Sequence, residues 1–120
     1  MKKVYVAGKY DDDNIISALE NMRLGMKVST ELLLKGYAPF CPWLDYHFVL
    51  MCPDGKHIEK SVYHKYSMQW LEVSDRVLAL PNWKNSGGAK REIARAEELG
   101  IPVYYSIPEL TNNKEIRCQR

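Results

Sequence analysis

The sequence predicts a three-layer α/β domain, with helices on both faces of a small parallel sheet. Short apolar segments alternate with longer segments of helical periodicity, in the order strand, helix, strand, loop, helix, strand, helix, strand. The first strand, residues 3–8 (KVYVAG), is apolar almost throughout, which is typical of a strand covered on both faces. Because crossovers between parallel strands are right-handed, few topologies remain. We expect a flavodoxin-like or Rossmann-like strand order of 2-1-3-4 within a single domain spanning residues 1–120.

The first helix is expected to begin at Asn14 and to end near Leu34. Residues 11–13 are aspartates, and Asp and Asn both favour a helix N-terminus, where they cap free amides and suit the dipole. Lys35 and Gly36 end the helix. Apolar residues that recur at helical spacing are predicted to face the core. These residues are Ile15, Leu19, Met22, Met26 and Leu33.

A short second strand begins at residues 37–38 and is expected to end near Phe40, because Pro39 and Pro42 each remove a hydrogen-bond donor from the sheet. Residues 42–59 are predicted to be irregular. The aromatic residues of this segment allow two interpretations, stacking on a ligand base or forming a hydrophobic flap over the sheet edge.

A second helix is expected over residues 58–73, with Ser67 on its apolar side. The apolar residues of that side are Val62, Tyr63, Tyr66, Trp70, Leu71 and Val73. We expect His57 and His64 at the surface, since no other residues are spaced to complete a zinc site with them.

The last third of the chain predicts one βαβ unit. Its parts are a strand over 76–80, a loop over 81–88, a helix over 89–99 and a strand over 103–105. Gly100 ends the helix and Pro102 prevents its continuation. One more helical turn is expected over residues 107–110. In a parallel sheet of order 2-1-3-4, residues 8–11 and the loop over 81–88 meet at one crevice, at the carboxyl ends of strands 1 and 3.

Glu92 occupies an unusual position in this unit. A helical projection places it between Ala96 and Leu99, on the apolar side of an amphipathic helix. A carboxylate there needs either an ion-pair partner or a function. The turn that precedes the helix, SGGA over 86–89, offers backbone amides and a helix N-terminus to a phosphate, although glycine pairs at helix starts are common.

Composition excludes several function classes. The net charge is +2, so no nucleic acid or anionic membrane partner is expected, and the basic residues of 114–120 are interpreted as a solvated end. The three cysteines, Cys41, Cys52 and Cys118, lack metal-ligand spacing and are interpreted as free thiols of a cytoplasmic protein. No signal peptide and no segment long enough to cross a bilayer are found. No metal or organic cofactor is expected.

The chain resembles the nucleoside 2-deoxyribosyltransferase superfamily, in particular its small 2′-deoxynucleoside 5′-phosphate N-hydrolase-like members. The resemblance covers most of the chain. It rests on VYVAGKY (4–10), on Asn14 and Ile15 opening the first helix, on GYAPFCP (36–42), and above all on SDRVLALPNWKNSGGAKREIARAEELGIPV (74–103). The S-x-G-A-x-x-E-x-x-x-A-x-x-x-G spacing within the last segment is its most specific part.

The resemblance implies roles for individual residues. Glu92 matches the catalytic glutamate, which attacks the anomeric carbon of the sugar, and Tyr5 matches the tyrosine that positions it. Ser86 matches a serine that helps to bind the 5′-phosphate. Further residues are expected to bind substrate. These are Gly8, Lys9 and Tyr10 after the first strand, Ser67, Asp75 before the third strand, and Gly87 and Gly88.

One departure from the family pattern concerns Ser67. The family usually has an aspartate at this position, where it contacts the base and assists its departure, and a serine is a poor proton donor. His64, Asp45 and Asp54 are possible substitutes, and the sequence favours none of them.

Taken together, the sequence predicts an enzyme that cleaves the base–sugar bond of a (deoxy)nucleoside 5′-monophosphate through a glutamate nucleophile. Two alternatives remain open at this stage, a nucleotide-binding or sensing module without catalysis and a deoxyribosyltransferase. The resemblance also implies a homo-oligomer, with a dimer favoured.

Overall fold

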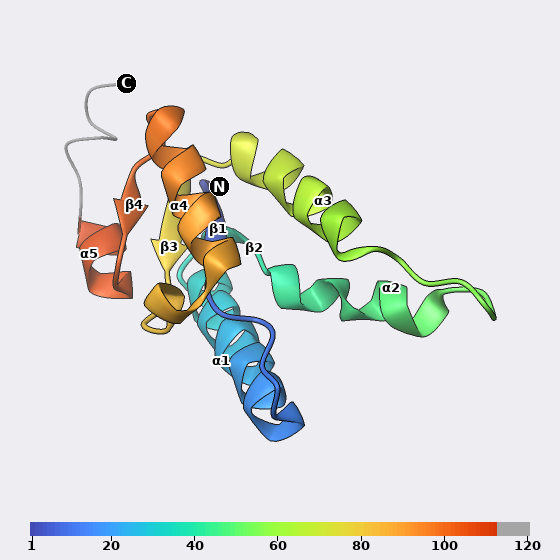
Figure 1. Cartoon of the computed structure of the whole chain (residues 1–120). Helices are drawn as coiled ribbons and strands as arrows, with labels where there is room; N and C mark the ends of the chain where they lie inside the picture. The colour runs from blue at the N-terminus through green and yellow to red at the C-terminus, as the bar shows by residue number, and fades with distance from the viewer. Residues whose placement is uncertain (113–120) are drawn as a thin grey trace.

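The computed structural model describes residues 1–112 and has the predicted strand order (Figure 1). Four parallel strands form one sheet in the order β2-β1-β3-β4, so the predicted topology is confirmed. The strands are Lys3–Ala7 (β1), Ala38–Phe40 (β2), Arg76–Ala79 (β3) and Val103–Tyr104 (β4). Tyr5 of the central strand β1 lies between Phe40 and Val77.

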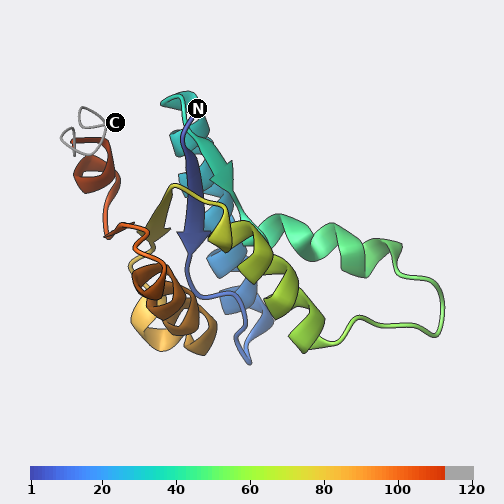
Figure 2. The ribbon, with the colours of Figure 1, turned by 90° about the horizontal axis from the view of Figure 1, so that it is seen from above.

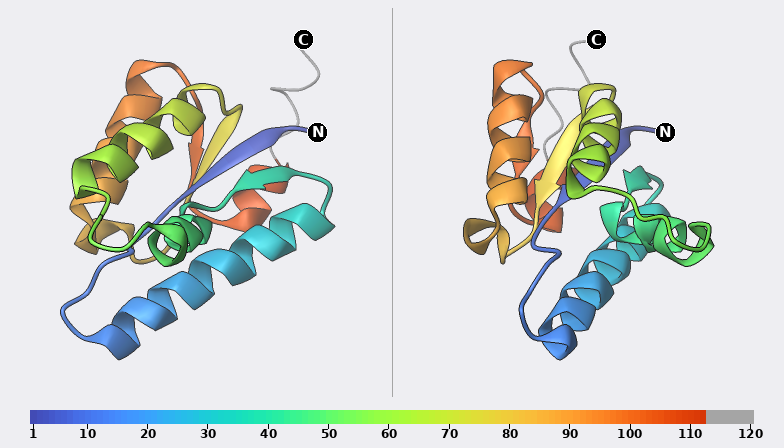
Figure 3. Two further views of the ribbon diagram at one scale, coloured as in Figure 1. Left: turned by 90° about the vertical axis from the view of Figure 1, so that its right-hand side faces the viewer. Right: turned by 45° about the vertical axis from the view of Figure 1, so that its right-hand side comes forward.

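Helices cover both faces of this sheet, as the two views of Figure 3 show. The helix α1 lies on one face, and α3 and α4 lie on the other. The helices are Ile15–Leu34 (α1), Tyr46–Met51 (α2), Lys60–Glu72 (α3), Gly87–Glu98 (α4) and Ile107–Asn112 (α5), with 3₁₀ turns at Pro42–Asp45 (η1) and Trp83–Asn85 (η2).

The residues of β1 alternate between two cores, one on each face, as expected for a strand. Val4 and Val6 pack with Leu32 of α1, Trp43 of η1 and Leu110 of α5. Tyr5 and Ala7 face the other way. They pack with residues of α3, β3 and α4, namely Leu71, Val77, Ala89 and Ala96. The sheet is therefore buried on both sides, which explains the continuous apolar sequence of its central strand.

Local sequence signals fix two helix ends as predicted, although α4 begins at Gly87, two residues before the predicted start at Ala89. The Asn14 side chain caps α1 and accepts a hydrogen bond from the Ile16 amide at 2.8 Å. Gly100, with a φ of 73°, follows the end of α4 in a backbone conformation that glycine adopts without strain.

The predicted core face of α1 is wrong. Ile15, Leu19 and Leu33 are 67%, 49% and 55% exposed, Met26 is exposed as well, and only Met22 of the predicted set packs against the core. The buried face of α1 carries small residues and a leucine, namely Gly25, Ser29 and Leu32. Helical spacing identifies a stripe, but the stripe that packs here is the one that leaves room for the Trp43 ring.

Residues 42–59 are more regular than predicted. The 3₁₀ turn η1 begins with Pro42, at a helical position where the missing amide hydrogen costs nothing, and α2 follows directly. Residues 52–59 then form the long connection to α3. Figure 2 shows α2, this connection and the start of α3 projecting away from the sheet.

The predicted apolar side of α3 is correct for Leu71, which is buried, and for Tyr63 and Tyr66, which are partly buried. Val62, Trp70 and Val73 are half exposed instead. Phe40 stacks on Trp70, with ring centroids 5.9 Å apart. No helix within residues 1–112 is both long enough and apolar enough to cross a membrane. Cys41 and Cys52 are free thiols, whereas Cys118 and the basic residues of 114–120 lie outside the described part of the chain.

Candidate functional site

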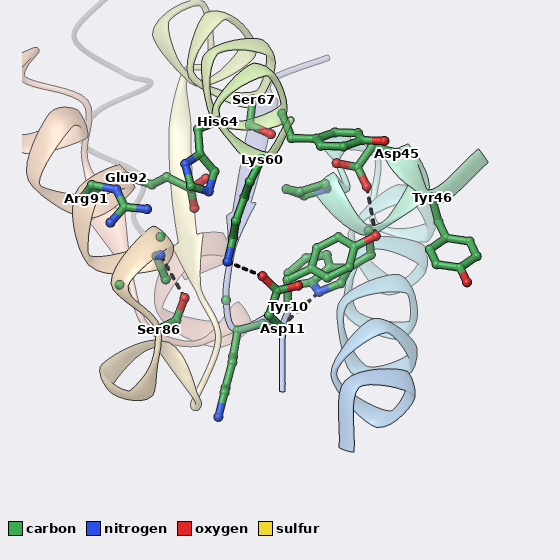
Figure 4. A pocket seen from close by; sticks show the side chains of 18 of the residues that line it. Tyr10, Asp11, Asp45, Tyr46, Lys60, His64, Ser67, Ser86, Arg91 and Glu92 are labelled. Atoms are coloured by element: carbon green, nitrogen blue, oxygen red, sulfur yellow. Dashed lines mark hydrogen bonds and ion pairs between the residues drawn. The ribbon is translucent and has the colours of Figure 1, made fainter. Parts of the chain in front are cut away.

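A cavity of about 670 Å³ opens at the carboxyl ends of β1 and β3, where the topology predicts a site (Figure 4). Its walls come from the loop after β1, from η1 and α2, from α3, and from the first turns of α4. Most of the substrate and catalytic residues expected from the sequence line it. They are Gly8, Lys9, Tyr10, Ser67, Ser86, Gly87, Gly88 and Glu92. The volume is within the range of cavities that hold small ligands.

Glu92 and Tyr5 are brought together from positions 87 residues apart. The Tyr5 hydroxyl donates a hydrogen bond to Glu92 Oε2 at 2.5 Å. Tyr5 lies on the central strand and is fully buried, so it holds one oxygen of the carboxylate in a fixed place. A hydrogen bond from Ser67 is among the interactions that act on the Tyr5 hydroxyl. Ser67 and Glu92 therefore both act on the Tyr5 hydroxyl within an otherwise apolar layer.

The environment shifts the acidity of both groups. Burial raises the pKa of Glu92 to about 7, and the Tyr5 hydrogen bond and the Arg91 charge only partly oppose this. Burial, followed by the charge of Glu92, holds the pKa of Tyr5 well above its usual value, so the hydroxyl keeps its proton and acts as a donor. At neutral pH a large fraction of the Glu92 carboxyl is thus ionised, poorly solvated and oriented. A carboxyl with such a pKa in a cavity is typical of catalytic sites, although structural ion pairs also shift pKa values.

The N-terminus of α4 forms the cationic end of the cavity. Ser86 caps the helix, and its Oγ accepts a hydrogen bond from the Ala89 amide at 3.0 Å while keeping its own proton to donate. The Arg91 guanidinium folds back over the first turn, with Nη1 3.4 Å from the place where a Gly87 side chain would begin. No ion pair of Arg91 occurs within residues 1–112. Amides, hydroxyl and guanidinium converge here as they do around bound phosphates.

Two further polar groups come from α3. Lys60 Nζ pairs with Asp11 Oδ2 at 2.6 Å, which joins the start of α3 to the loop after β1. His64 lines the cavity, and burial followed by the Arg91 and Lys60 charges holds the pKa of its ring below the usual value. These effects favour the neutral form of His64, and the charge of Asp11 opposes them only in part.

Aromatic side chains and one buried acid form the opposite side of the cavity. Tyr10 stacks on Trp43 with ring centroids 6.3 Å apart, and Tyr46 and Tyr63 also line this part. The Tyr10 hydroxyl donates to Asp45 Oδ1 at 3.0 Å. Burial raises the pKa of Asp45, and the hydrogen bond from Tyr10 opposes this only in part. Flat rings beside a polar group suit a nucleobase.

Asp75 is not brought to this cavity. It precedes β3 and accepts a hydrogen bond from the Lys3 amide at 2.7 Å, at the amino-terminal edge of the sheet. The cavity lies at the carboxyl-terminal edge, so a substrate in it is separated from Asp75 by the length of the strand. Asp75 holds the starts of two neighbouring strands together.

Sequence reasoning did not single out several cavity residues. Arg91 adjoins Glu92 on the first turns of α4, so its place near a helix N-terminus was a usable signal. The segment that projects from the sheet consists of α2, residues 52–59 and the start of α3. It brings three more residues to the cavity, namely Tyr46, Lys60 and Tyr63. The sequence does not indicate the path of this segment. No group of three or more His, Cys, Asp or Glu side chains in the described residues is arranged to hold a metal ion.

The sequence profile of a known family matches residues 2–106. That family is described as a domain of unknown function (DUF7768). The chain belongs to the DUF7768 family. A comparison with curated protein sequences finds no match for this DUF7768 domain.

Solved structures show the fold of this DUF7768 chain in other proteins. One is a 2-deoxyribosyltransferase from Bacillus psychrosaccharolyticus, which is 19% identical with a TM-score of 0.61, and the match covers 84% of this chain and 69% of that one. Another is a conserved protein from Enterococcus faecalis V583, also 19% identical, with a TM-score of 0.65 over 86% of this chain and 61% of that one. The DUF7768 chain thus has a nucleoside 2-deoxyribosyltransferase-like fold, and it spans about six to seven tenths of these neighbours.

Proposed function

We propose that this chain cleaves the N-glycosidic bond of a (deoxy)nucleoside 5′-monophosphate, with Glu92 as the nucleophile. One observation carries the proposal: Glu92 is held by Tyr5 in a cavity that also contains a cationic helix N-terminus. A nucleotide has three parts that suit three regions of this cavity. Its phosphate suits Ser86 and Arg91, its anomeric carbon suits Glu92, and its base suits the aromatic side.

The proposed reaction has two steps. A Glu92 oxygen attacks C1′ of the sugar while the C1′–N bond breaks and its electron pair leaves with the base. Water then attacks C1′ of the resulting ester, which frees Glu92 and releases the sugar phosphate. Cleavage of this bond passes through an oxocarbenium-like state, which an ionised carboxylate stabilises in a poorly solvated site. The carboxylate that attacks C1′ and stabilises this state comes from the chain itself.

Transfer of the sugar to a second base is the alternative reaction. The fold neighbour from Bacillus psychrosaccharolyticus is a 2-deoxyribosyltransferase, and a transferase would use the same first step. We favour hydrolysis of a monophosphate because no carboxylate of residues 1–112 pairs with the Arg91 guanidinium or the Ser86 hydroxyl at the helix N-terminus beside Glu92. A nucleotide-binding module without catalysis is the third candidate, since Ser67 occupies the position at which the nucleoside 2-deoxyribosyltransferase superfamily usually has an aspartate.

A panel assay tests these candidates. The protein is incubated with ribo- and deoxyribonucleosides and with their 5′-monophosphates, and free base is measured by chromatography. We expect base release from one or more monophosphates and at least about tenfold less from the matching nucleosides, because charge-assisted hydrogen bonds to the phosphate are lost. Release that increases only when a second free base is added indicates the transferase. Absence of release together with ligand-induced thermal stabilisation indicates the binding module.

We also propose that the chain forms a homodimer. In the described residues, α1 exposes Ile15, Ile16 and Leu19, and α2 exposes Leu50 and Met51 at 70% and 77%. Apolar surface of this extent on neighbouring turns of a helix is typical of protein interfaces. The segment that projects from the sheet adds to this exposed surface. It also carries part of the cavity wall.

Light scattering during size-exclusion chromatography tests the assembly, and we expect the mass of a dimer at micromolar concentration. Leu19→Lys and Leu50→Lys place a charge on each apolar surface in turn, and at least one of them is expected to yield a monomer because burying a charge is costly. Glu20→Lys, on an exposed polar position of α1, is the matched control and should remain dimeric. A wild-type monomer would contradict the proposal.

A further inference from the structure

We propose that Asp45 is the acid that protonates the departing base, in place of the helix acid that this chain lacks at Ser67. The inference rests on the proposed function. It assigns a catalytic residue on η1, a different element from the one that carries Ser67. The structure separates Asp45 from the other two acids or bases that the sequence left as candidates.

The first step concerns position. Asp45 and His64 line the cavity, whereas Asp54 lies exposed in the connection between α2 and α3 and is not part of the cavity wall. Figure 4 shows Asp45 beside Tyr10, on the side of the cavity away from Ser86 and Arg91. A nucleotide with its phosphate at the α4 N-terminus and C1′ at Glu92 directs its base towards this side. Asp54 is therefore excluded by its position.

The second step concerns charge. His64 shares its surroundings with Arg91 and Lys60, both cationic, and these charges together with burial disfavour its protonated form. Asp45 has no cationic ion-pair partner within residues 1–112. Burial raises its pKa and so favours its protonated form, and the Tyr10 hydrogen bond and the His47 charge oppose this only in part. Of the two groups that line the cavity, only Asp45 is thus in an environment that helps it to hold and donate a proton.

The third step concerns free bonding capacity. Asp45 is buried, and its one hydrogen bond within the described residues is the bond that Oδ1 accepts from the Tyr10 hydroxyl. That bond fixes the carboxyl beside the Tyr10–Trp43 stack and leaves Oδ2 for a ligand. An unpaired carboxyl oxygen that is open to the cavity, next to stacked rings, fits a nitrogen or oxygen at the edge of a base.

The proton balance is closed over the two steps. As the C1′–N bond breaks and Glu92 bonds to C1′, the Asp45 proton passes to the base, which leaves neutral, and Asp45 becomes a carboxylate. When water attacks C1′ in the second step, its oxygen forms the new bond, Glu92 leaves as a carboxylate, and the proton released by the water returns to Asp45. Ser67 takes no part in the transfer and acts on the Tyr5 hydroxyl instead.

The test varies the need for protonation. A purine monophosphate that the wild type cleaves is compared with its N7-methylated form, whose cationic base leaves as a neutral molecule without a proton donor. Asp45→Asn is expected to slow cleavage of the ordinary nucleotide by about a hundredfold, and to change cleavage of the methylated one by less than about threefold, after subtraction of the uncatalysed rate. Asp54→Asn is the matched control and should cleave both at wild-type rates.

The outcomes separate this inference from the proposed function. Equal losses on both nucleotides, or no loss on either, overturn the role of Asp45 while leaving cleavage by Glu92 intact. A gain from Ser67→Asp without any loss from Asp45→Asn overturns it as well. If the wild type cleaves neither nucleotide, the proposed function fails and this inference fails with it. Thermal melting checks the fold of each variant, and Asp45→Ser gives the same comparison if Asp45→Asn does not fold.

Discussion

Replacing Glu92 by glutamine is expected to abolish base release and, at the same time, to stabilise the folded chain above pH 7. A carboxamide cannot attack C1′, so we expect base release to fall by at least about a thousandfold. The glutamine keeps the size of the side chain and an oxygen that can accept the Tyr5 hydrogen bond. The variant therefore removes the charge with little change in packing.

The stability effect follows from the pKa of Glu92. Burial raises that pKa to about 7 from an ordinary 4.5, so the folded chain holds this proton more tightly than the unfolded chain does. The resulting stabilisation is fully present below pH 4.5 and is lost as the pH rises through 7. Above pH 7 the buried charge costs about 2 to 3 kcal/mol, with allowance for partial exposure of the side chain. Glutamine avoids this cost.

Urea unfolding at pH 4.5 and at pH 8 measures the difference. Glu92→Gln and the wild type should be equally stable at pH 4.5, and the variant should be more stable at pH 8 by about 2 to 3 kcal/mol. Glu97→Gln, on the exposed side of the same helix, is the control and should stay within about 0.5 kcal/mol of the wild type at both values. Equal stability of Glu92→Gln and wild type at pH 8 would falsify the prediction that the Glu92 carboxylate is buried and ionised at that pH. In many enzymes the reactive form of the active site lowers the stability of the folded chain.

The parts of the fold that follow from local chemistry could be predicted from the sequence. Asn14 caps a helix, Gly100 ends one, and the continuous apolar sequence of β1 indicates a strand buried on both faces. Each of these signals acts within a few residues, where capping, backbone freedom and burial have one dominant effect. The strand order then follows from right-handed crossovers, which is a rule about chain connection and needs no side-chain detail.

The packed face of α1 could not be predicted in the same way. Apolar periodicity chose the stripe through Leu19 and Leu33, but Gly25 and Ser29 are the buried positions, and Gly25 lies against Trp43 of η1. The packed face is decided by Trp43, which is distant in sequence. Its ring lies directly against Gly25, where a residue with a side chain would overlap it. An apolar stripe facing solvent also satisfies the pattern when a second copy of the chain covers it, as we propose here.

The candidate site also has features that could be predicted from the sequence and features that could not. Glu92 attracted attention from the sequence as an acid on an apolar helix face, but its pairing with Tyr5 came from a family resemblance, because 87 residues separate the two. Asp75 was expected at the site from the resemblance alone. It precedes β3, whereas the carboxyl end of a parallel strand is the end that reaches the site. Lys60 reaches the cavity through tertiary packing alone, whereas Arg91 carried a local signal, its place in the first turns of α4.

Gly25→Ala is expected to destabilise the chain by about 2 kcal/mol, the opposite of what this substitution does in an exposed helix. In an exposed helix alanine is favoured over glycine by about 1 kcal/mol. At Gly25 a methyl group would overlap the six-membered ring of Trp43. That ring is 1% exposed, its Nε1 donates to the Lys9 carbonyl at 3.2 Å, and it stacks on Tyr10, so it cannot move without loss of these contacts. Overpacking of this kind typically costs about 1 to 3 kcal/mol.

Urea unfolding of Gly25→Ala, Trp43→Phe and the double variant tests this explanation. Phenylalanine lacks the ring that the methyl group meets, so the double variant should be more stable than the sum of the single effects by at least about 1 kcal/mol. Additive effects, or a Gly25→Ala chain that is more stable than the wild type, would show that Trp43 has room to move. The substitution also links packing to the site, because the Trp43 ring supports Tyr10, and Tyr10 holds Asp45. Gly25→Ala should therefore weaken nucleotide binding as well, even though Gly25 is not part of the cavity wall.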